Sequence, residues 1–256
     1  MKKQLVSLSK KLITLILGII LIFGLPMQKS LAACPENLQE LQELFDIQLQ
    51  RSYTRGVVDA AHAREDEIDN TLWSITSDNP DLIWREVDGK PQVLMVTWTA
   101  WNGYNDKVGE KMQLSREVWT TPVPQLQTFG SELSLNEDNL TLRLEQYLGL
   151  PPRNGKSKFV QMWVEPKDLF RPCPDPEIND TSCDLEFPDN VEPLHEEWVN
   201  DKILTSYGEN GYPWTRLGYT YDWGSIATEI GGSEFVVSSG AEVEIDSVIN
   251  TVEYVR

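Results

Sequence analysis

The sequence predicts an α+β fold: an N-terminal helical segment followed by a mainly antiparallel β-sheet domain with one or two packed helices. Apolar residues recur every three or four positions over residues 36–67 and then alternate in short runs. Short turn signals, Asp88-Gly89 and Ser239-Gly240, join several of these runs, as antiparallel strands require. Helices and strands do not alternate regularly, which argues against a parallel α/β sheet.

Residues 1–33 predict a secretory signal. A lysine-rich start, an apolar run over residues 12–25 and the small-residue stretch 30–33 form the pattern of bacterial export signals. The run is shorter than the roughly 20 apolar residues that a membrane-spanning helix needs. We therefore expect the rest of the chain to work outside the cytoplasm.

Cys34 is open to two interpretations. Residues 31–34, Leu-Ala-Ala-Cys, resemble the lipobox of bacterial lipoproteins, and the resemblance implies a lipid on Cys34 as the link to a membrane. Ordinary cleavage after Ala32 would instead leave a soluble secreted protein. The chain has three cysteines, so lipidation of Cys34 would leave Cys173 and Cys183 to pair in an oxidising compartment.

The net charge of −18 excludes some partners. An acidic surface repels nucleic-acid backbones and anionic lipid headgroups, so we expect no nucleic-acid partner and no electrostatic membrane binding. Nine Trp and eight Tyr are enough to supply a binding face as well as a core. The length fits one α+β domain over residues 71–256 after a helical lead segment, residues 34–70.

In chain order, residues 36–67 form the first expected helix, because its leucines share one face. Strands follow at 83–87, at 92–101, where both faces are apolar as in a central strand, and at 117–121, before two prolines. A helix over 139–148 ends at glycine and proline.

The second half continues the pattern. A strand over 159–165 alternates, and a proline-rich acidic stretch follows it at 166–193. Residues 195–204 suit another helix. Closing strands are expected at 217–223, 234–238 and 241–255.

The segment between Cys173 and Cys183 reads as a surface loop closed by a disulfide. Four oxygen-bearing side chains fall near calcium-loop spacing, at Asp175, Glu177, Asn179 and Glu186. Glycine is missing from the tight turn and Cys183 holds a ligand position, so an ordinary loop without metal is the favoured interpretation.

Aromatic side chains beside polar groups suggest a binding site for a small molecule, a glycan or a protein partner of the cell envelope. One candidate wall lies in residues 207–223 and comprises Tyr212, Trp214, Tyr219, Tyr221 and Trp223. A second wall comprises Trp98, Trp101 and Tyr104. Packing of these rings in the core is the alternative.

A secreted hydrolase or transferase that uses carboxylates is the other hypothesis. Its candidate catalytic residues are Glu234 as general base or transition-state stabiliser, Arg216 to orient an anionic substrate, and Asp222. His62 and His195 lack metal-ligand spacing, and no nucleophile elbow or phosphate loop is present, so no cofactor is expected. Sequence alone leaves open whether the protein is an enzyme.

One short pattern resembles a known family. Residues 233–245, a glutamate before an apolar strand, a turn and a second strand, resemble the closing hairpin of ADP-ribosyltransferase-like domains. The resemblance covers about a dozen residues and implies that Glu234 is a catalytic glutamate. It also implies an arginine and a Ser-Thr pair, for which Arg116 and Thr120-Thr121 are the stand-ins.

Overall fold

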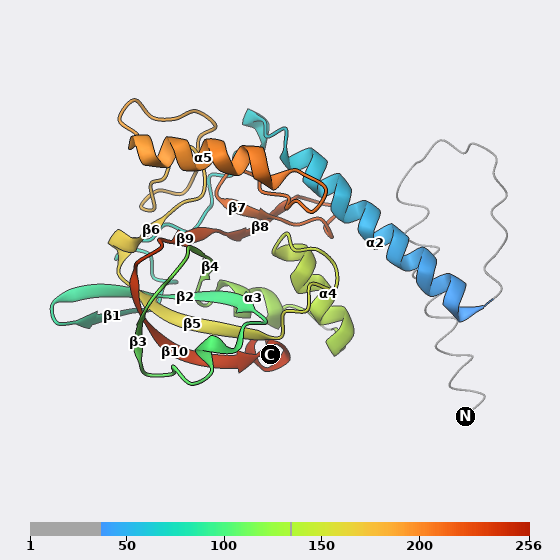
Figure 1. Cartoon of the computed structure of the whole chain (residues 1–256), viewed down its shortest axis with the longest axis horizontal. Coiled ribbons are helices and arrows are strands. Elements are labelled where there is room, and N and C mark those ends of the chain that lie inside the picture. The colour runs from blue at the N-terminus through green and yellow to red at the C-terminus, as the bar shows by residue number, and fades with distance from the viewer. Residues whose placement is uncertain (1–36, 134) are drawn as a thin grey trace. The chain divides into compact units, whose positions relative to one another are not determined.

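A computed structural model describes residues 37–133 and 135–256 of the chain (Figure 1). The chain divides into two compact units, residues 1–51 and residues 52–256. The predicted export signal and Cys34 lie outside the described residues. None of the helices in the described ranges is both long enough and apolar enough to cross a membrane.

Helix α2 (Leu38–Ala60) is the predicted lead helix, and it ends earlier than the expected residue 67. Asn37 starts it, because its side-chain oxygen accepts a hydrogen bond of 3.0 Å from the backbone N–H of Glu40. Near its end, Gly56 allows close packing: a Cβ there would lie 3.0 Å from the ring of Tyr221. A short 3-10 turn, η1 (Glu65–Glu67), follows.

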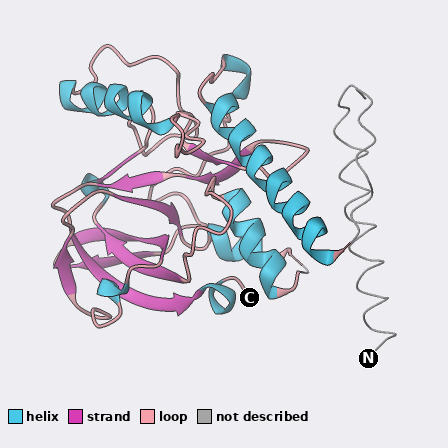
Figure 2. Ribbon diagram, turned by 45° about the vertical axis from the view of Figure 1, so that its right-hand side comes forward, coloured by secondary structure: helices cyan, strands magenta, loops and turns pink. Residues whose placement is uncertain are grey.

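The predicted α+β fold is confirmed: the helix is followed by a mostly antiparallel sheet with few helices (Figure 1 and Figure 2). The described strands of the main sheet run in the order β3-β10-β5-β2-β4-β9-β6, with β1 paired to β2. All these strand pairs are antiparallel. Their bounds are β1 Trp84–Val87, β2 Lys90–Thr99, β3 Lys111–Gln113, β4 Val118–Pro122, β5 Lys158–Val164, β6 Leu169–Phe170, β9 Phe235–Val237 and β10 Glu242–Asn250.

A smaller sheet and the remaining helices complete the second unit. Strands β7 (Tyr219–Tyr221) and β8 (Ile230–Ser233) form a two-stranded antiparallel sheet. The helices are α3 Gln125–Ser131, α4 Glu137–Tyr147, α5 Pro193–Ser206 and α6 Thr251–Tyr254, with short 3-10 turns η2 at Asn102–Tyr104 and η3 at Pro166–Asp168.

Caps explain two differences from the expected boundaries. The side chain of Asn136 accepts a hydrogen bond of 3.0 Å from the N–H of Asn139, so α4 begins before the expected residue 139. Asn250 likewise accepts from the N–H of Val252 at 3.1 Å. The expectation of one strand over 241–255 was therefore wrong at its end, where the chain turns into α6.

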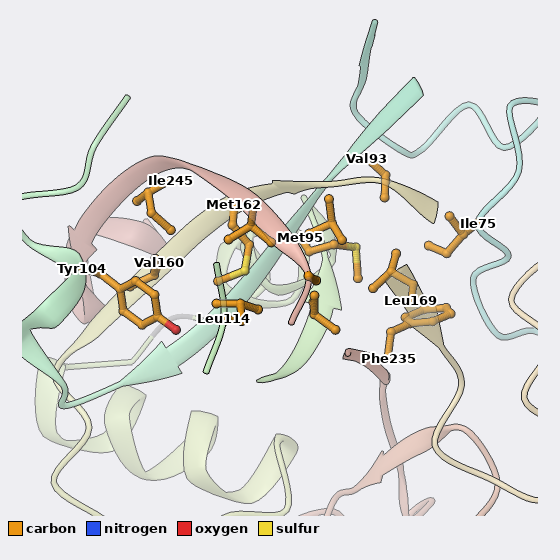
Figure 3. Close-up of a cluster of buried hydrophobic side chains, with 14 of the residues drawn as sticks. Ile75, Val93, Met95, Tyr104, Leu114, Val160, Met162, Leu169, Phe235 and Ile245 are labelled. Atoms are coloured by element: carbon orange, nitrogen blue, oxygen red, sulfur yellow. The ribbon is translucent and has the colours of Figure 1, made fainter. Parts of the chain in front are cut away.

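Strand β2 is buried on both faces, as expected for a central strand. Val93 and Met95 join a cluster with Met162 of β5 and Ile245 of β10 (Figure 3). On the opposite face, the side chains of β2 pack with those of helices α3, α4 and α6; the buried members include Leu94, Val96, Trp98, Leu126, Leu140, Leu144 and Tyr254. Helices thus cover one face of the sheet.

Candidate functional site

A cavity of about 480 Å³ opens in the sheet where β2 and β4 part. The two strands pair only through Met95 with Pro122 and Val96 with Thr121 among the described residues. Beyond Val96, β2 continues along β5 as far as Thr99, whereas β4 follows β9. Residues of both strands line the space left between them.

Glu234, the residue immediately before β9, lines this cavity. Its backbone N–H donates to the carbonyl of Gly218 at 2.9 Å, and the next residue, Phe235, pairs with Thr120 of β4. Within the part of the chain that the structure describes, no hydrogen bond or ion pair engages the Glu234 carboxyl. Burial raises its pKa to about 8, because the protein around the cavity solvates an anion poorly.

The other residues named by the family resemblance line the same cavity. Thr120 and Thr121 are buried on β4, and the Thr120 hydroxyl donates to the carbonyl of Phe235 at 3.1 Å. Arg116 is exposed in the segment that leads into β4. The fold therefore gathers Arg116, the threonine pair and Glu234 around one space.

One predicted aromatic wall also belongs to the cavity. Trp98 is buried, and its indole N–H donates to the Thr251 hydroxyl at 2.8 Å. Trp101 is 55% exposed and meets the ring of Tyr104 edge-on, with the centroids 4.6 Å apart. Burial raises the pKa of Tyr104, and the positive charge of Arg116 acts in the opposite direction.

Lys156 is a cavity residue that sequence analysis missed. Its Nζ donates to the backbone carbonyl of Trp98 at 2.9 Å, and burial lowers its pKa. The sequence offers no signal for it, because a lysine between Gly155 and Ser157 looks like any surface lysine.

Glu117 and Trp119 were missed as well. Both line the cavity, and the Glu117 carboxylate accepts hydrogen bonds from Trp198 at 2.7 Å and from Lys202. Burial raises the pKa of Glu117, but these donors outweigh it and hold the pKa below its ordinary value. Glu117 is therefore a paired anion, in contrast to Glu234.

The structure does not bring Arg216 and Asp222 to the cavity that Glu234 lines. Arg216 donates to the carbonyl of Ala61 at 3.1 Å, and its Nε is buried without a partner among the described residues. Asp222 is buried and accepts hydrogen bonds from Arg143 at 2.7 and 2.5 Å. The three predicted catalytic residues thus occupy separate places.

The predicted aromatic wall of residues 207–223 does not line the cavity either. Four of its rings use their polar atoms inside the fold: Trp214 donates to Pro172, Tyr219 to Glu67, Tyr221 to Asp59 and Trp223 to Leu150. Tyr212 is exposed. These partners lie in several other segments, so the rings of this stretch hold elements together.

The predicted disulfide joins Cys173 to Cys183. Within its loop, the carboxylates of Asp175, Glu177 and Asp180 gather within 4.8 Å of one another, and Glu186 is not part of that group. The buried guanidinium of Arg171 lies 3.5 Å from Asp180 and supplies positive charge there. The acidic group of this loop is therefore partnered by a cation from the segment just before the loop.

The two histidines contact backbone carbonyls. His195 Nε2 lies 2.7 Å from the carbonyl of Cys173, and burial lowers its pKa. His62 Nδ1 lies 2.9 Å from the carbonyl of Val58. Neither belongs to a cluster of metal-ligating side chains among the described residues.

Comparison with known proteins gives no relative. The chain matches no protein family, no curated protein and no solved structure.

Proposed function

We propose that this protein is an exported enzyme, a carboxylate-dependent hydrolase or transferase of the ADP-ribosyltransferase-like kind, with the cavity as its active site. The observation that carries the proposal is the unpaired carboxyl of Glu234 in a cavity of about 480 Å³. A group with a strongly raised pKa in a pocket is a candidate for acid–base work.

Glu234 has the properties that a general base needs. Its pKa of about 8 is close to neutral, so it accepts and releases a proton near working pH. With no other acid in contact, its ionised form can also stabilise positive charge that develops in a bound substrate.

The rest of the cavity suits a substrate that has a flat ring and negative charge. Trp101 is exposed and offers a ring for stacking, Trp98 and Tyr104 are buried and support it in the wall, and Arg116 and Lys156 offer cations. The family resemblance names Arg116, Thr120, Thr121 and Glu234 together, and their common cavity supports it.

The reaction of such an enzyme balances with Glu234 alone as the acid–base group. The N-glycosidic bond of the dinucleotide NAD⁺ breaks, and its electron pair leaves with nicotinamide. The oxygen of water or of an acceptor hydroxyl forms a bond to the same ribose carbon, and its proton passes to the Glu234 carboxylate. Arg116 holds the negatively charged part of the substrate.

Export and lipid attachment form part of the proposal. The lysine-rich start, the apolar run and Leu31-Ala32-Ala33-Cys34 support secretion and a lipid on Cys34. The Cys173–Cys183 disulfide supports an oxidising compartment.

A binding protein without catalysis is the second candidate. The exposed ring of Trp101 in the cavity favours it, because such a ring can bind a ligand without any chemistry. Its ligand would be a small molecule, a glycan or another envelope component.

Release of nicotinamide from NAD⁺, measured by chromatography, separates the two candidates. Glu234→Gln should lower the rate at least about 100-fold, the usual effect of losing an acid–base group. Glu242→Gln is the matched control, because Glu242 is an exposed acid whose carboxylate accepts a hydrogen bond from Lys111. A wild-type protein that binds ligand but never releases nicotinamide, with water or with envelope extract as acceptor, would be the binding protein.

A further inference from the structure

We infer that Lys156 is a substrate-anchoring residue that holds an oxyanion, such as a phosphate, of the ligand in the cavity. This inference deepens the proposed function and rests on it for the identity of the substrate. It adds a specificity-determining residue outside the residues that the family resemblance names.

The parting of β2 and β4 explains why Lys156 is where it is. On β2, the backbone groups of Thr99 face β5, since the Thr99 carbonyl accepts from Ser157 at 3.2 Å. By alternation, the carbonyl of Trp98 faces the side of β4, where β4 has already turned away. Lys156 Nζ donates a hydrogen bond to this carbonyl at 2.9 Å, where the N–H of a neighbouring strand would otherwise do so.

That one hydrogen bond leaves most of the ammonium group unused. An ammonium has three N–H donors, and the carbonyl of Trp98 accepts one of them. The remaining donors of Lys156 have no protein partner among the described residues, and the residue lines the cavity. The geometry thus leaves donors for a ligand at a fixed position.

The charge around Lys156 is unusual for this protein. The chain has 40 acidic residues and a net charge of −18, yet no carboxylate in the described ranges forms an ion pair with Lys156. Lys156 is partly buried, so its charge is less well solvated than in water, and an anionic ligand in the cavity would offset that loss. The lowered pKa of Lys156 has burial as its cause and is consistent with an unmatched charge.

Lys158 provides the contrast two residues further on. Its Nζ donates to the side-chain oxygens of Asn102 and, at 3.0 Å, of Asn105, and it does not line the cavity. A lysine whose task is structural satisfies its donors with protein oxygens in this way. Lys156 does so with one donor only.

The experiment uses the full exported chain and isothermal titration calorimetry with two matched probes. ADP-ribose carries a pyrophosphate, and adenosine shares its ring and ribose but has no charge. Inorganic pyrophosphate serves as a third probe, free of any assumption about the ring. The variants are Lys156→Met, Lys156→Gln and Lys156→Arg, with Lys158→Met as the matched control.

We expect wild type to bind ADP-ribose more tightly than adenosine. Lys156→Met and Lys156→Gln should each lower the affinity for ADP-ribose about tenfold, which is the effect of losing a charged hydrogen bond. Adenosine affinity should stay unchanged, Lys156→Arg should retain most of the ADP-ribose affinity, and Lys158→Met should match wild type. Glutamine can still donate to a carbonyl, so Lys156→Gln remains informative where Lys156→Met does not fold.

Two results would overturn the inference: equal ADP-ribose affinity in wild type and in folded Lys156→Gln, or no binding of ADP-ribose and pyrophosphate by wild type. Failure of the proposed function has a different signature. If the protein binds pyrophosphate through Lys156 but never cleaves NAD⁺, the oxyanion site is supported and the proposed reaction is rejected.

Discussion

Arg143 of helix α4 holds both carboxylate oxygens of Asp222, which follows β7, with hydrogen bonds of 2.7 and 2.5 Å. The backbone N–H groups of Gly224 and Ser225 donate to the same carboxylate at 3.1 and 3.2 Å. Asp222 is buried, and its carboxylate accepts these hydrogen bonds from the protein itself, so its role is to stabilise the fold. The pair ties α4 to the small β7–β8 sheet.

Asp222→Asn should therefore reduce stability and leave chemistry intact. Removing one partner of a buried ion pair leaves the other charge unmatched, and we expect the free energy of unfolding to fall by about 3 kcal/mol. Urea unfolding measures the change, and the rate per folded molecule should equal that of wild type. Asp201→Asn, at an exposed position of α5, is the control. If Asp222→Asn is stable but inactive, Asp222 takes part in catalysis and this prediction is wrong.

Glu234 should make stability fall as pH rises. Its folded pKa of about 8 exceeds the ordinary 4.5, so between these values the folded state keeps a proton that the unfolded state releases. Stability from the neutral carboxyl is full below pH 4.5 and is lost as pH rises through 8. Relative to wild type, Glu234→Gln should gain on the order of 2 kcal/mol between pH 4.5 and pH 8.5, after allowance for water in the cavity. Urea unfolding of both proteins across this range tests it; parallel curves would contradict a raised pKa for the Glu234 carboxyl.

The same group should shape the pH dependence of catalysis. A general base works when ionised, so kcat/KM for NAD⁺ should rise with pH and level off above about 8, since this ratio reports the free enzyme. The residual rate of Glu234→Gln should lack this rise. Initial rates measured from pH 5.5 to pH 9.5 check the prediction, and a profile that falls through pH 8 would assign Glu234 the role of general acid.

The Cys173–Cys183 disulfide should contribute about 3 kcal/mol to stability, because it closes a short loop in the unfolded chain. Reductant should lower the urea midpoint of wild type towards that of the double variant Cys173→Ala, Cys183→Ala. The double variant should not respond to reductant, which controls for effects elsewhere. Equal midpoints for oxidised and reduced wild type would show that the three-dimensional contacts of the loop suffice.

Gly103→Ala should disturb the cavity wall without touching a charged group. A Cβ at Gly103 would lie 2.0 Å from Cζ2 of Trp101, so the ring must leave its edge contact with Tyr104. We expect a shift in tryptophan emission and a higher KM with a smaller change in kcat, as for lost ground-state binding. Gly208→Ala is the matched control, because no atom lies within 4 Å of a Cβ there. An unchanged KM would remove Trp101 from the binding surface.

The sequence predicts the fold class well because its signals are local. Apolar residues on both faces of 92–101 identify β2, and the cysteine count leads to the Cys173–Cys183 pair. The site depends on long-range register, which such patterns do not carry. Thr120 and Phe235 are 115 positions apart, and their pairing brings Glu234 to Arg116 and the threonines. Arg216, close to Glu234 in sequence, binds Ala61 instead.

The short junction between β2 and β4 has a mechanical consequence. Met95 and Val96 are the β2 residues through which these strands pair in the described chain. Glu234 and Thr120 belong to the half of the sheet on one side of this junction, and Trp98 and its partner Lys156 to the other. The Glu234 carboxyl and the Lys156 ammonium therefore come from opposite sides of this junction, and their separation depends on the twist between the two halves of the sheet.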